Sequence, residues 1–368
     1  MKDSLNSIFC NLLRVALGIT PEFPYSPTEQ EWQTLFKMAK LQTVLGVLFN
    51  AFPRLGVESR PPRQLVLRYA PFVETVRGHN RLMNQDAARY TRLFAERGVK
   101  GVILKGQANA RLYPDPLSRQ AGDIDIWIPG GYDHAKQLLF EMDLVAKEDS
   151  AGIALPHVRH LGFRNENGIE IEVHHRPAEV HFRNAEFQAC LLEELDKATL
   201  TPEGFYSPSI RFALLMQLQH LYYHCLREGI GLRHFMDYYV LLTHSTEADR
   251  EFVWAKVRRF GLKHACAAVM WVLGEVFGLQ QGQMLCQPDR RRGLRLYRET
   301  FAGGNFGRGS LPQGKRRAPL NRRIAFRLKA LSWFCFDPLN TVLREVHYWR
   351  DTISLIPERI KRKNFFLK

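Results

Sequence analysis

The feature that most constrains this chain is the hexapeptide at positions 123–128, Asp-Ile-Asp-Ile-Trp-Ile, in which every second residue is isoleucine. A period of two is typical of a β-strand, whose successive side chains point to opposite faces of a sheet. Asp123 and Asp125 then project from one face, and the isoleucines project into a core on the other. Two adjacent carboxylates repel each other unless a cation lies between them, and Mg²⁺ prefers carboxylate oxygens. The hexapeptide therefore predicts a strand with a cation site on one face.

A second alternating segment, Ile169–His174, carries further acids. It places Glu170, Glu172 and His174 on one face of a strand. The preceding segment, His157–Arg164, is separated from it by Asn-Glu-Asn-Gly, which predicts a β-hairpin. If this hairpin pairs with the first strand, a third carboxylate joins the two aspartates. Both glutamates lie on the required face, so the alternation alone leaves the choice between them open.

Helical patterns surround these strands. Thr28 is a candidate N-cap for a helix, and a long helix is predicted from about Arg63 to Arg97, ending at Gly98. We therefore expect an α+β fold, in which helical segments flank a small mixed sheet on its N- and C-terminal sides. The predicted regions are an N-terminal helical region (1–99), an α/β core (100–182), a second helical region (183–280) and a basic C-terminal extension (281–368).

The positive charge of the chain is concentrated at its C-terminal end. The formal net charge is +15, and residues 288–368 hold 20 Lys and Arg against 6 Asp and Glu. The basic character therefore describes a segment with its own partner rather than the whole fold. Basic and apolar residues interleave from Leu320 to Phe336, a pattern that fits a helix on an anionic membrane surface, an RNA-binding segment or a solvated tail. The sequence does not separate these interpretations.

No segment predicts a membrane span or an export signal. The longest apolar passage, His264–Leu279, carries Glu275 and is too short to cross a bilayer. Asn11 and Arg14 interrupt the apolar run at the N-terminus, so this run does not fit a signal peptide. Six scattered cysteines without a CxxC pair suit a reducing compartment. We expect a cytoplasmic protein, with peripheral attachment at the inner face of the membrane as an alternative that rests on the basic segment.

The motifs together resemble those of a known superfamily. The chain reads LKG, LYPDP, an arginine and GDIDIWI, followed by IEVHHRP, and the similarity extends from roughly Trp32 to Phe277. This succession resembles the DNA polymerase β nucleotidyltransferase superfamily, and more narrowly a branch of uncharacterised bacterial nucleotidyltransferases. The resemblance implies transfer of a nucleoside monophosphate from an NTP to an acceptor hydroxyl, with release of pyrophosphate. It also implies two Mg²⁺ ions, with Mn²⁺ as the alternative.

The resemblance assigns expected roles to the acids. Asp123, Asp125 and Glu172 are the expected metal ligands and catalytic residues. Glu172 is preferred to Glu170 because the superfamily places its third acid just before an apolar residue and a histidine. His174 is expected either to orient this acid or contact the nucleotide, or to be a packing histidine; both interpretations stay open.

Phosphate contacts are expected upstream of the acids. Lys105 and Gly106 occupy the place where the superfamily binds the triphosphate, and glycine permits close approach of the backbone. Gln107 stands where the superfamily usually has Ser or Gly, so Lys105 is expected to replace a hydroxyl contact with its charge. Arg119 is expected either to contact phosphate or to form a surface salt bridge.

Two pairs of polar residues occur at helical spacing in the second helical region. His220 and His224 share one helix face, and Arg233 and Asp237 share another. No further Cys or His completes a zinc motif nearby. Either they form an internal polar network, or, as the resemblance implies, they cap the cleft and contact the base or acceptor.

The acceptor itself is not readable from the sequence. A small molecule, a sugar, a protein side chain and the end of an RNA all fit the chemistry. Two other classes of function remain as alternatives. One is a non-catalytic nucleotide-binding or regulatory protein, and the other is an adaptor that binds RNA or a membrane through residues 288–368.

Overall fold

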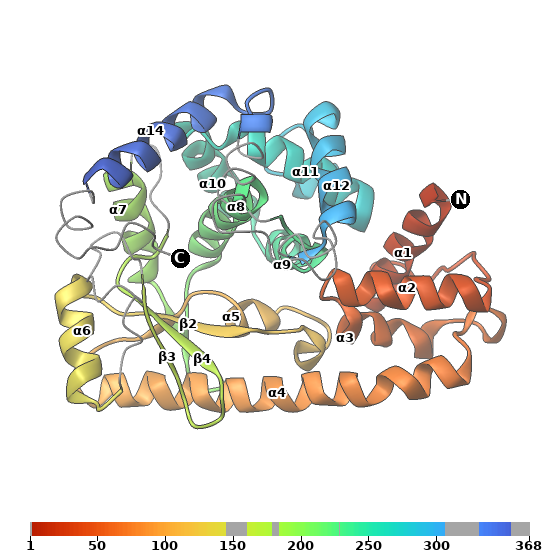
Figure 1. Cartoon of the computed structure of the whole chain (residues 1–368), viewed down its shortest axis with the longest axis horizontal. Helices are drawn as coiled ribbons and strands as arrows, with labels where there is room; N and C mark the ends of the chain where they lie inside the picture. Colours follow the sequence, from red (N-terminus) through yellow and green to blue (C-terminus); the bar gives the residue numbers. More distant parts are fainter. Residues whose placement is uncertain (1, 145–159, 179–183, 228, 306–330, 355–368) are drawn as a thin grey trace.

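A mixed six-stranded sheet organises the described part of the chain. The computed structural model describes residues 2–144, 160–178, 184–227, 229–305 and 331–354. The strand order is β3-β4-β2-β1-β6-β5, and helices cover both sides of the sheet (Figure 1). This is the α+β fold that the sequence predicts. The strands are β1 (Val102–Ile103), β2 (Asp123–Trp127), β3 (His160–Arg164), β4 (Glu170–His174), β5 (Thr199–Leu200) and β6 (Tyr206–Ser207).

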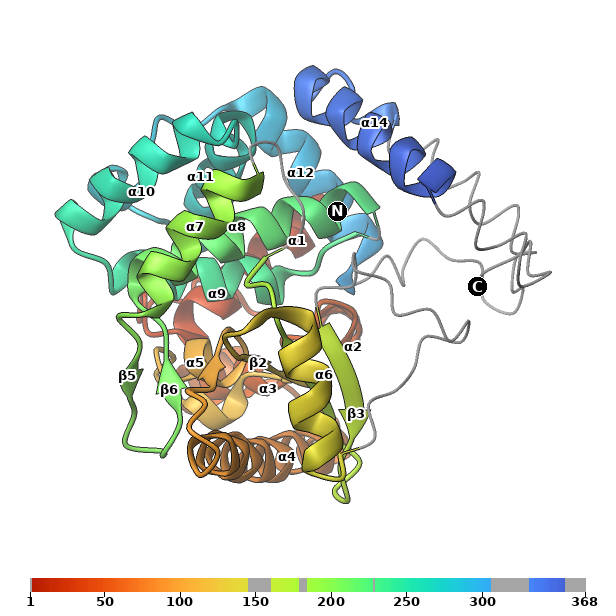
Figure 2. The ribbon, with the colours of Figure 1, turned by 90° about the vertical axis from the view of Figure 1, so that its left-hand side faces the viewer.

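The helices form two groups around this sheet. The long helix α4 runs along one side, and α8 to α12 lie on the opposite side (Figures 1 and 2). Among the described residues, no helix has the length and apolar character needed to cross a membrane. The helices are α1 (Lys2–Ala16), α2 (Glu29–Leu41), α3 (Leu45–Leu48), α4 (Arg63–Ala95), α5 (Gln107–Ala110), α6 (Gly131–Glu141), α7 (Asn184–Leu195), α8 (Ile210–Arg227), α9 (Leu232–Thr243), α10 (Glu247–Arg259), α11 (Lys263–Phe277), α12 (Arg290–Gly303) and α14 (Pro338–Ser354).

Local sequence signals set the ends of the N-terminal helices. Thr28 accepts a hydrogen bond from the Glu31 amide while the Glu31 carboxylate accepts one from the Thr28 amide, which forms a capping box at the start of α2. Helix α4 extends over 33 residues and is followed by Gly98, whose φ of +71° suits the left-handed turn after a helix. Both predicted helix ends are therefore confirmed.

The pairing of β2 with β4 places the acidic residues side by side. These strands are parallel and adjacent, with Asp123 beside Glu170 and Asp125 beside Glu172. Strand β4 pairs antiparallel with β3, which confirms the predicted hairpin and sets His160 opposite His174. The polar face of the sheet thus continues across three neighbouring strands, with its acids on β2 and β4.

The opposite face of these strands is a hydrophobic core. Side chains of β2, β3 and β4 pack there against α4 and α6, so the alternation in the sequence separates a buried apolar face from a polar one. This packing fixes the strands, and with them the positions of the acids. The core residues include Met83, Ala87, Tyr90 and Phe94 of α4, Ile124 and Ile126 of β2, Leu161 and Phe163 of β3, Ile171 and Val173 of β4, and Leu138 and Leu139 of α6.

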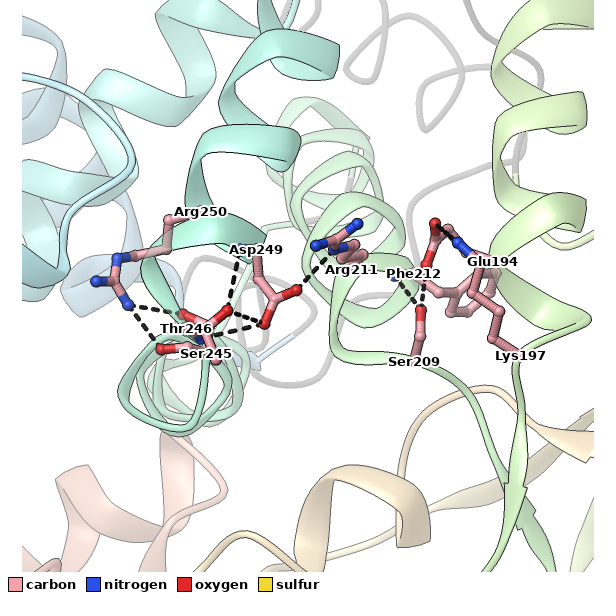
Figure 3. A network of polar contacts seen from close by, with 9 residues as sticks. All are labelled: Glu194, Lys197, Ser209, Arg211, Phe212, Ser245, Thr246, Asp249 and Arg250. Atoms are coloured by element: carbon pink, nitrogen blue, oxygen red, sulfur yellow. Dashed lines mark hydrogen bonds and ion pairs between the residues drawn. The ribbon is translucent and has the colours of Figure 1, made fainter.

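A polar network fastens three helices of the opposite layer (Figure 3). Arg211 of α8 donates to Asp249 of α10 with a distance of 2.6 Å from Nε to Oδ1. Asp249 also closes a capping box with Thr246. At the other end, the Ser209 hydroxyl donates to Glu194 of α7 over 2.7 Å. The network holds α7, α8 and α10 together in the helical layer on the side of the sheet opposite α4.

Some elements differ from the sequence expectation. The apolar run Val99–Leu104 favours a strand, but only β1 forms within it, and β5 and β6 lie in a region predicted to be helical. Strands of two residues are too short to show a period, so pattern analysis misses them. Helix α12 begins with three consecutive arginines and was not predicted; it packs through Gly293, where an added Cβ would lie 2.5 Å from Trp271.

Several other expected elements lie wholly or partly outside the described residues. The stretch 303–319, rich in Gly, Pro, Lys and Arg, favours a loop, and 144–147 favours a strand; positions 306–319 and 145–147 lie outside. So do positions 320–330 of the interleaved segment and positions 157–159 of the hairpin.

Candidate active site

Three carboxylates from two strands converge on the polar face of the sheet. One oxygen from each of Asp123, Asp125 and Glu172 lies within 4.8 Å of the others. The Asp125 side chain is 1% exposed, whereas those of Asp123 and Glu172 are 40% and 21% exposed, so the group is open to solvent on one side. Glu170 instead forms an ion pair with Arg164 at 3.3 Å. Position therefore distinguishes Glu172 from Glu170.

The ammonium group of Lys105 lies against the two aspartates. Its Nζ is 2.7 Å from Oδ2 of Asp125 and 3.8 Å from Oδ2 of Asp123. The Leu104 amide donates to the Asp125 carbonyl, which places the residue after β1 beside β2. Lys105 lowers the pKa of Asp123, but Asp125, burial and Glu172 raise it, and the net pKa lies above its ordinary value. The charge of one ammonium group therefore does not fully neutralise the negative charge of the carboxylates.

Two histidines border the carboxylates. Nε2 of His174 lies 2.9 Å from Oδ1 of Asp125 and 3.4 Å from Oε2 of Glu172. Nδ1 of His160 is also 3.4 Å from Oε2 of Glu172. Burial raises the pKa of Glu172, but the hydrogen bond with His174 and the charges of both imidazoles outweigh this effect, and the pKa is lowered. His174 therefore lies where it can orient both acids.

His160 was missed in the sequence, although a signal for it existed. The turn around Asn165–Gly168 closes the hairpin, and its register pairs His160 with His174 across β3 and β4. His160, Glu172 and His174 also present donor atoms within 4.8 Å of one another. The site therefore contains imidazole nitrogens in addition to carboxylate oxygens.

Gly106 forms the turn after β1. Its φ of +63° and ψ of −104° lie in a region that residues with a side chain rarely adopt. The position of an added Cβ lies 3.7 Å from the Asp123 carbonyl oxygen, so the turn brings the backbone close to β2. Gln107 is 1% exposed, and its amide contacts Sδ of Met83 on α4 at 3.5 Å. The Gln107 side chain thus points toward α4 and does not replace the missing hydroxyl.

Arg119 and Asp237 form a buried ion pair between the loop before β2 and α9. Nε and one terminal nitrogen of Arg119 each donate to Asp237 over 2.7 Å, and the Tyr113 hydroxyl donates to the same carboxylate over 2.7 Å. Burial lowers the pKa of Arg119, but Asp237 outweighs it and raises the pKa. The alternative of a surface salt bridge for Arg119 is wrong, because both side chains are buried.

Arg233 lies beside this pair and close to the acids. One of its terminal nitrogens donates to the Gln120 carbonyl over 2.7 Å. Burial and the charge of Arg119 lower the pKa of Arg233, while Asp237 and Asp123 act in the opposite direction. Arg233 is therefore a half-buried cation within electrostatic reach of the carboxylates.

The histidines of α8 lie in a cluster that the sequence indicated only in part. The ring centroids of His220 and His224 are 4.3 Å apart, and His234 of α9 lies 6.0 and 6.2 Å from them. Burial, followed by the charge of Arg233, holds the pKa of His234 well below its ordinary value. The three imidazole rings pack together between α8 and α9, and contact of His220 and His224 with the base or acceptor stays a prediction.

The donor set fits a divalent cation. Carboxylate oxygens suit Mg²⁺ and Mn²⁺, and imidazole nitrogens add affinity for Mn²⁺ and other transition metals. Lys105 already occupies a position between the aspartates, which shows that the geometry attracts positive charge there. Such a site can bind metal and an anionic substrate beside Lys105 and Arg233.

Comparison with known proteins adds a family match. A family model described as "uncharacterised nucleotidyltransferase" matches residues 28–278, which include every site residue above. A crystal structure of an antigenic nucleotidyltransferase-like protein from Paracoccidioides brasiliensis is 15% identical, covers 53% of this chain and 91% of its own chain, and superimposes with a TM-score of 0.33. A search of curated proteins gave no match.

Proposed function

The chain belongs to the family of uncharacterised nucleotidyltransferases, and from this premise we propose that it transfers a nucleoside monophosphate from an NTP to an acceptor hydroxyl and releases pyrophosphate. The family match confirms the resemblance seen in the sequence and makes the protein a transferase of phosphorus-containing groups. The observation that carries the finer proposal is the convergence of Asp123, Asp125 and Glu172 on one sheet face. Nucleotidyl transfer needs such a group of acids beside cationic side chains.

The three acids hold the metal in this proposal. Asp123 and Asp125 would each contact metal, and Glu172 would hold the metal that activates the acceptor hydroxyl. When bound, Mg²⁺ or Mn²⁺ neutralises phosphate charge and lowers the pKa of the acceptor hydroxyl. Glu172 is also placed to accept the proton of that hydroxyl, because its lowered pKa keeps it ionised. His174 keeps Asp125 and Glu172 oriented through its contacts with both.

The cationic side chains bind the phosphates. Lys105, which lies 2.7 Å from Asp125, would pair with the triphosphate, and Gly106 would let its backbone approach the phosphates closely. Arg233 offers a second charge from α9. Contact of Arg119 with phosphate remains a prediction. The pairing of Arg119 with Asp237 supports a structural role for Arg119, in which it holds α9 and the loop before β2 together.

The metal, the acceptor and the location form the remaining parts of the proposal. Two Mg²⁺ ions fit the carboxylates, and the neighbouring imidazoles favour Mn²⁺ as an alternative. The acceptor is a hydroxyl on a small molecule, sugar, protein or RNA. We place the protein in the cytoplasm, and residues 288–368 provide a basic surface for an anionic membrane or RNA.

Labelled nucleotides test the proposal directly. The full chain is incubated with Mg²⁺ or Mn²⁺ and each NTP labelled in turn at the α- or the γ-phosphate, in the presence of a cell lysate. Nucleotidyl transfer moves the α-label, and not the γ-label, to an acceptor. Glu172→Gln should reduce this transfer roughly 10²- to 10⁴-fold, the range typical of a lost catalytic acid or base.

Glu170→Gln is the matched control, because Glu170 lies on the same strand and face but pairs with Arg164. It should change the transfer less than about fivefold, the equivalent of a surface ion pair. Transfer of the γ-label would indicate a kinase instead. Nucleotide binding without transfer of either label would support the non-catalytic alternative, and equal loss in both variants would remove Glu172 from its role.

A further inference from the structure

Two histidines and a glutamate gather where β3 pairs with β4 at one end of the sheet. His160 lies on β3, Glu172 and His174 lie on β4, and the antiparallel register sets His160 opposite His174. The period of two places Glu172 on the same face as His174. These neighbouring strands (Figure 1) bring one donor atom from each side chain within 4.8 Å of the others. The group shares only Glu172 with the three carboxylates.

The distances within this group match the spacing of ligands around one metal ion. Oε2 of Glu172 is 3.4 Å from Nδ1 of His160 and 3.4 Å from Nε2 of His174. Both distances are longer than the roughly 2.7–3.2 Å of most hydrogen bonds between nitrogen and oxygen. In a tetrahedral site with bonds of about 2.1 Å, neighbouring ligand atoms lie roughly 3.4 Å apart. An ion can therefore reach Glu172 and both imidazoles with small adjustments of the side chains.

The surroundings of the group favour a bound cation. The His160 side chain is 30% exposed and that of His174 is 1% exposed, so the group opens to solvent on one side and has a buried ligand on the other. Gly162 pairs with Glu172 across the two strands, so β3 places no side chain beside this carboxylate at that position. The negative charge of Asp125, 2.9 Å from Nε2 of His174, adds to the attraction for a cation.

The donor atoms select the class of ion. Imidazole nitrogen suits zinc and neighbouring transition metals, whereas Mg²⁺ prefers oxygen ligands in an octahedral arrangement. Two histidines and one glutamate, with water in the remaining position, are a frequent ligand set for zinc. We propose that His160, Glu172 and His174 bind one divalent transition-metal ion of the zinc type. Binding of this ion does not depend on nucleotidyl transfer.

Zinc binding by the full chain tests the proposal. The chain is stripped with a chelator, and its affinity for Zn²⁺ is measured by competition with a chromophoric chelator in an excess of Mg²⁺. His160→Gln should weaken binding at least roughly 10- to 100-fold, the cost of losing even an outer partner of a metal ligand. Asp123→Asn, which alters only the three-carboxylate group, and His134→Gln, which removes an exposed histidine of α6, should lose far less. All three variants should keep the melting temperature of the stripped parent, because the exchanged side chains are partly or fully exposed.

Exchange of one ligand for another gives a second test. Co²⁺ in place of Zn²⁺ reports its ligands through its absorption spectrum, in which a thiolate ligand adds a charge-transfer band. His160→Cys should keep the ion and gain this band, which the parent should lack. A thiolate band in the parent that persists in His160→Gln would place the ion at Cys266 and Cys286, whose sulfur atoms are 3.7 Å apart, and would overturn the proposal. So would an absence of Zn²⁺ binding, an affinity unchanged in His160→Gln, or an equal loss in Asp123→Asn.

Discussion

Substitution of Asp237 by alanine tests how the active-site face is held to the helical layer. The Asp237 carboxylate accepts two hydrogen bonds from Arg119 and one from Tyr113, and it is 1% exposed. Asp237→Ala leaves the guanidinium group buried without its counterion, which costs about 3–5 kcal/mol. The buried Tyr113 hydroxyl also loses its acceptor, which adds about 1 kcal/mol or more to the loss of stability. Since proteins are stable by about 5–15 kcal/mol, the variant loses at least a quarter of its stability.

Urea unfolding, followed by tryptophan fluorescence and circular dichroism, measures this loss as a lower midpoint. Glu186→Gln is the control, since it removes an ion pair of similar length, 2.6 Å to Arg259, whose side chains are 55% and 44% exposed. Its expected cost is about 0–1 kcal/mol. The double variant Arg119→Met with Asp237→Leu replaces the pair by apolar side chains and should be more stable than Asp237→Ala.

Two results would refute this reasoning. If Asp237→Ala lowers the midpoint no more than Glu186→Gln does, the buried pair does not hold α9 to the loop before β2. If the double variant is as unstable as the single one, the cost does not come from the stranded guanidinium group of Arg119.

Three further predictions concern metal, pH and backbone. Mn²⁺ at about 100 times its dissociation constant should stabilise the chain by about 2.7 kcal/mol, which is measured as a rise in melting temperature. Glu172→Gln should lose this rise, and Glu170→Gln should keep it. Burial beside Arg233 depresses the pKa of His234 below its ordinary value of 6.5. The neutral His234 therefore contributes stability above that pH, and this contribution is lost as the pH falls. His234→Phe should flatten the acid side of the profile of stability against pH, and an unchanged profile would contradict this. Gly106→Ala should cost about 1–3 kcal/mol from backbone strain alone, because the nearest atom, 3.7 Å away, leaves room for the methyl group; a midpoint equal to that of the parent would show that the turn tolerates a side chain.

The sequence by itself determined the local features around the site. The period of two separated the acids from the isoleucines of β2, and the Asn-Glu-Asn-Gly turn predicted the hairpin. Thr28 and Gly98 predicted helix ends that the structure confirms. These features depend on side chains a few residues apart, so a linear pattern contains the information.

Only the tertiary structure decided which side chains meet. Glu170 and Glu172 share a face, and the register of β4 against β2 separates their positions. Arg119 meets Asp237 across 118 positions of the chain, and the short strands β5 and β6 gain their hydrogen bonds by joining a sheet that already exists. Such contacts arise when distant segments bury their apolar faces together, and no local period of the sequence records that choice of partner.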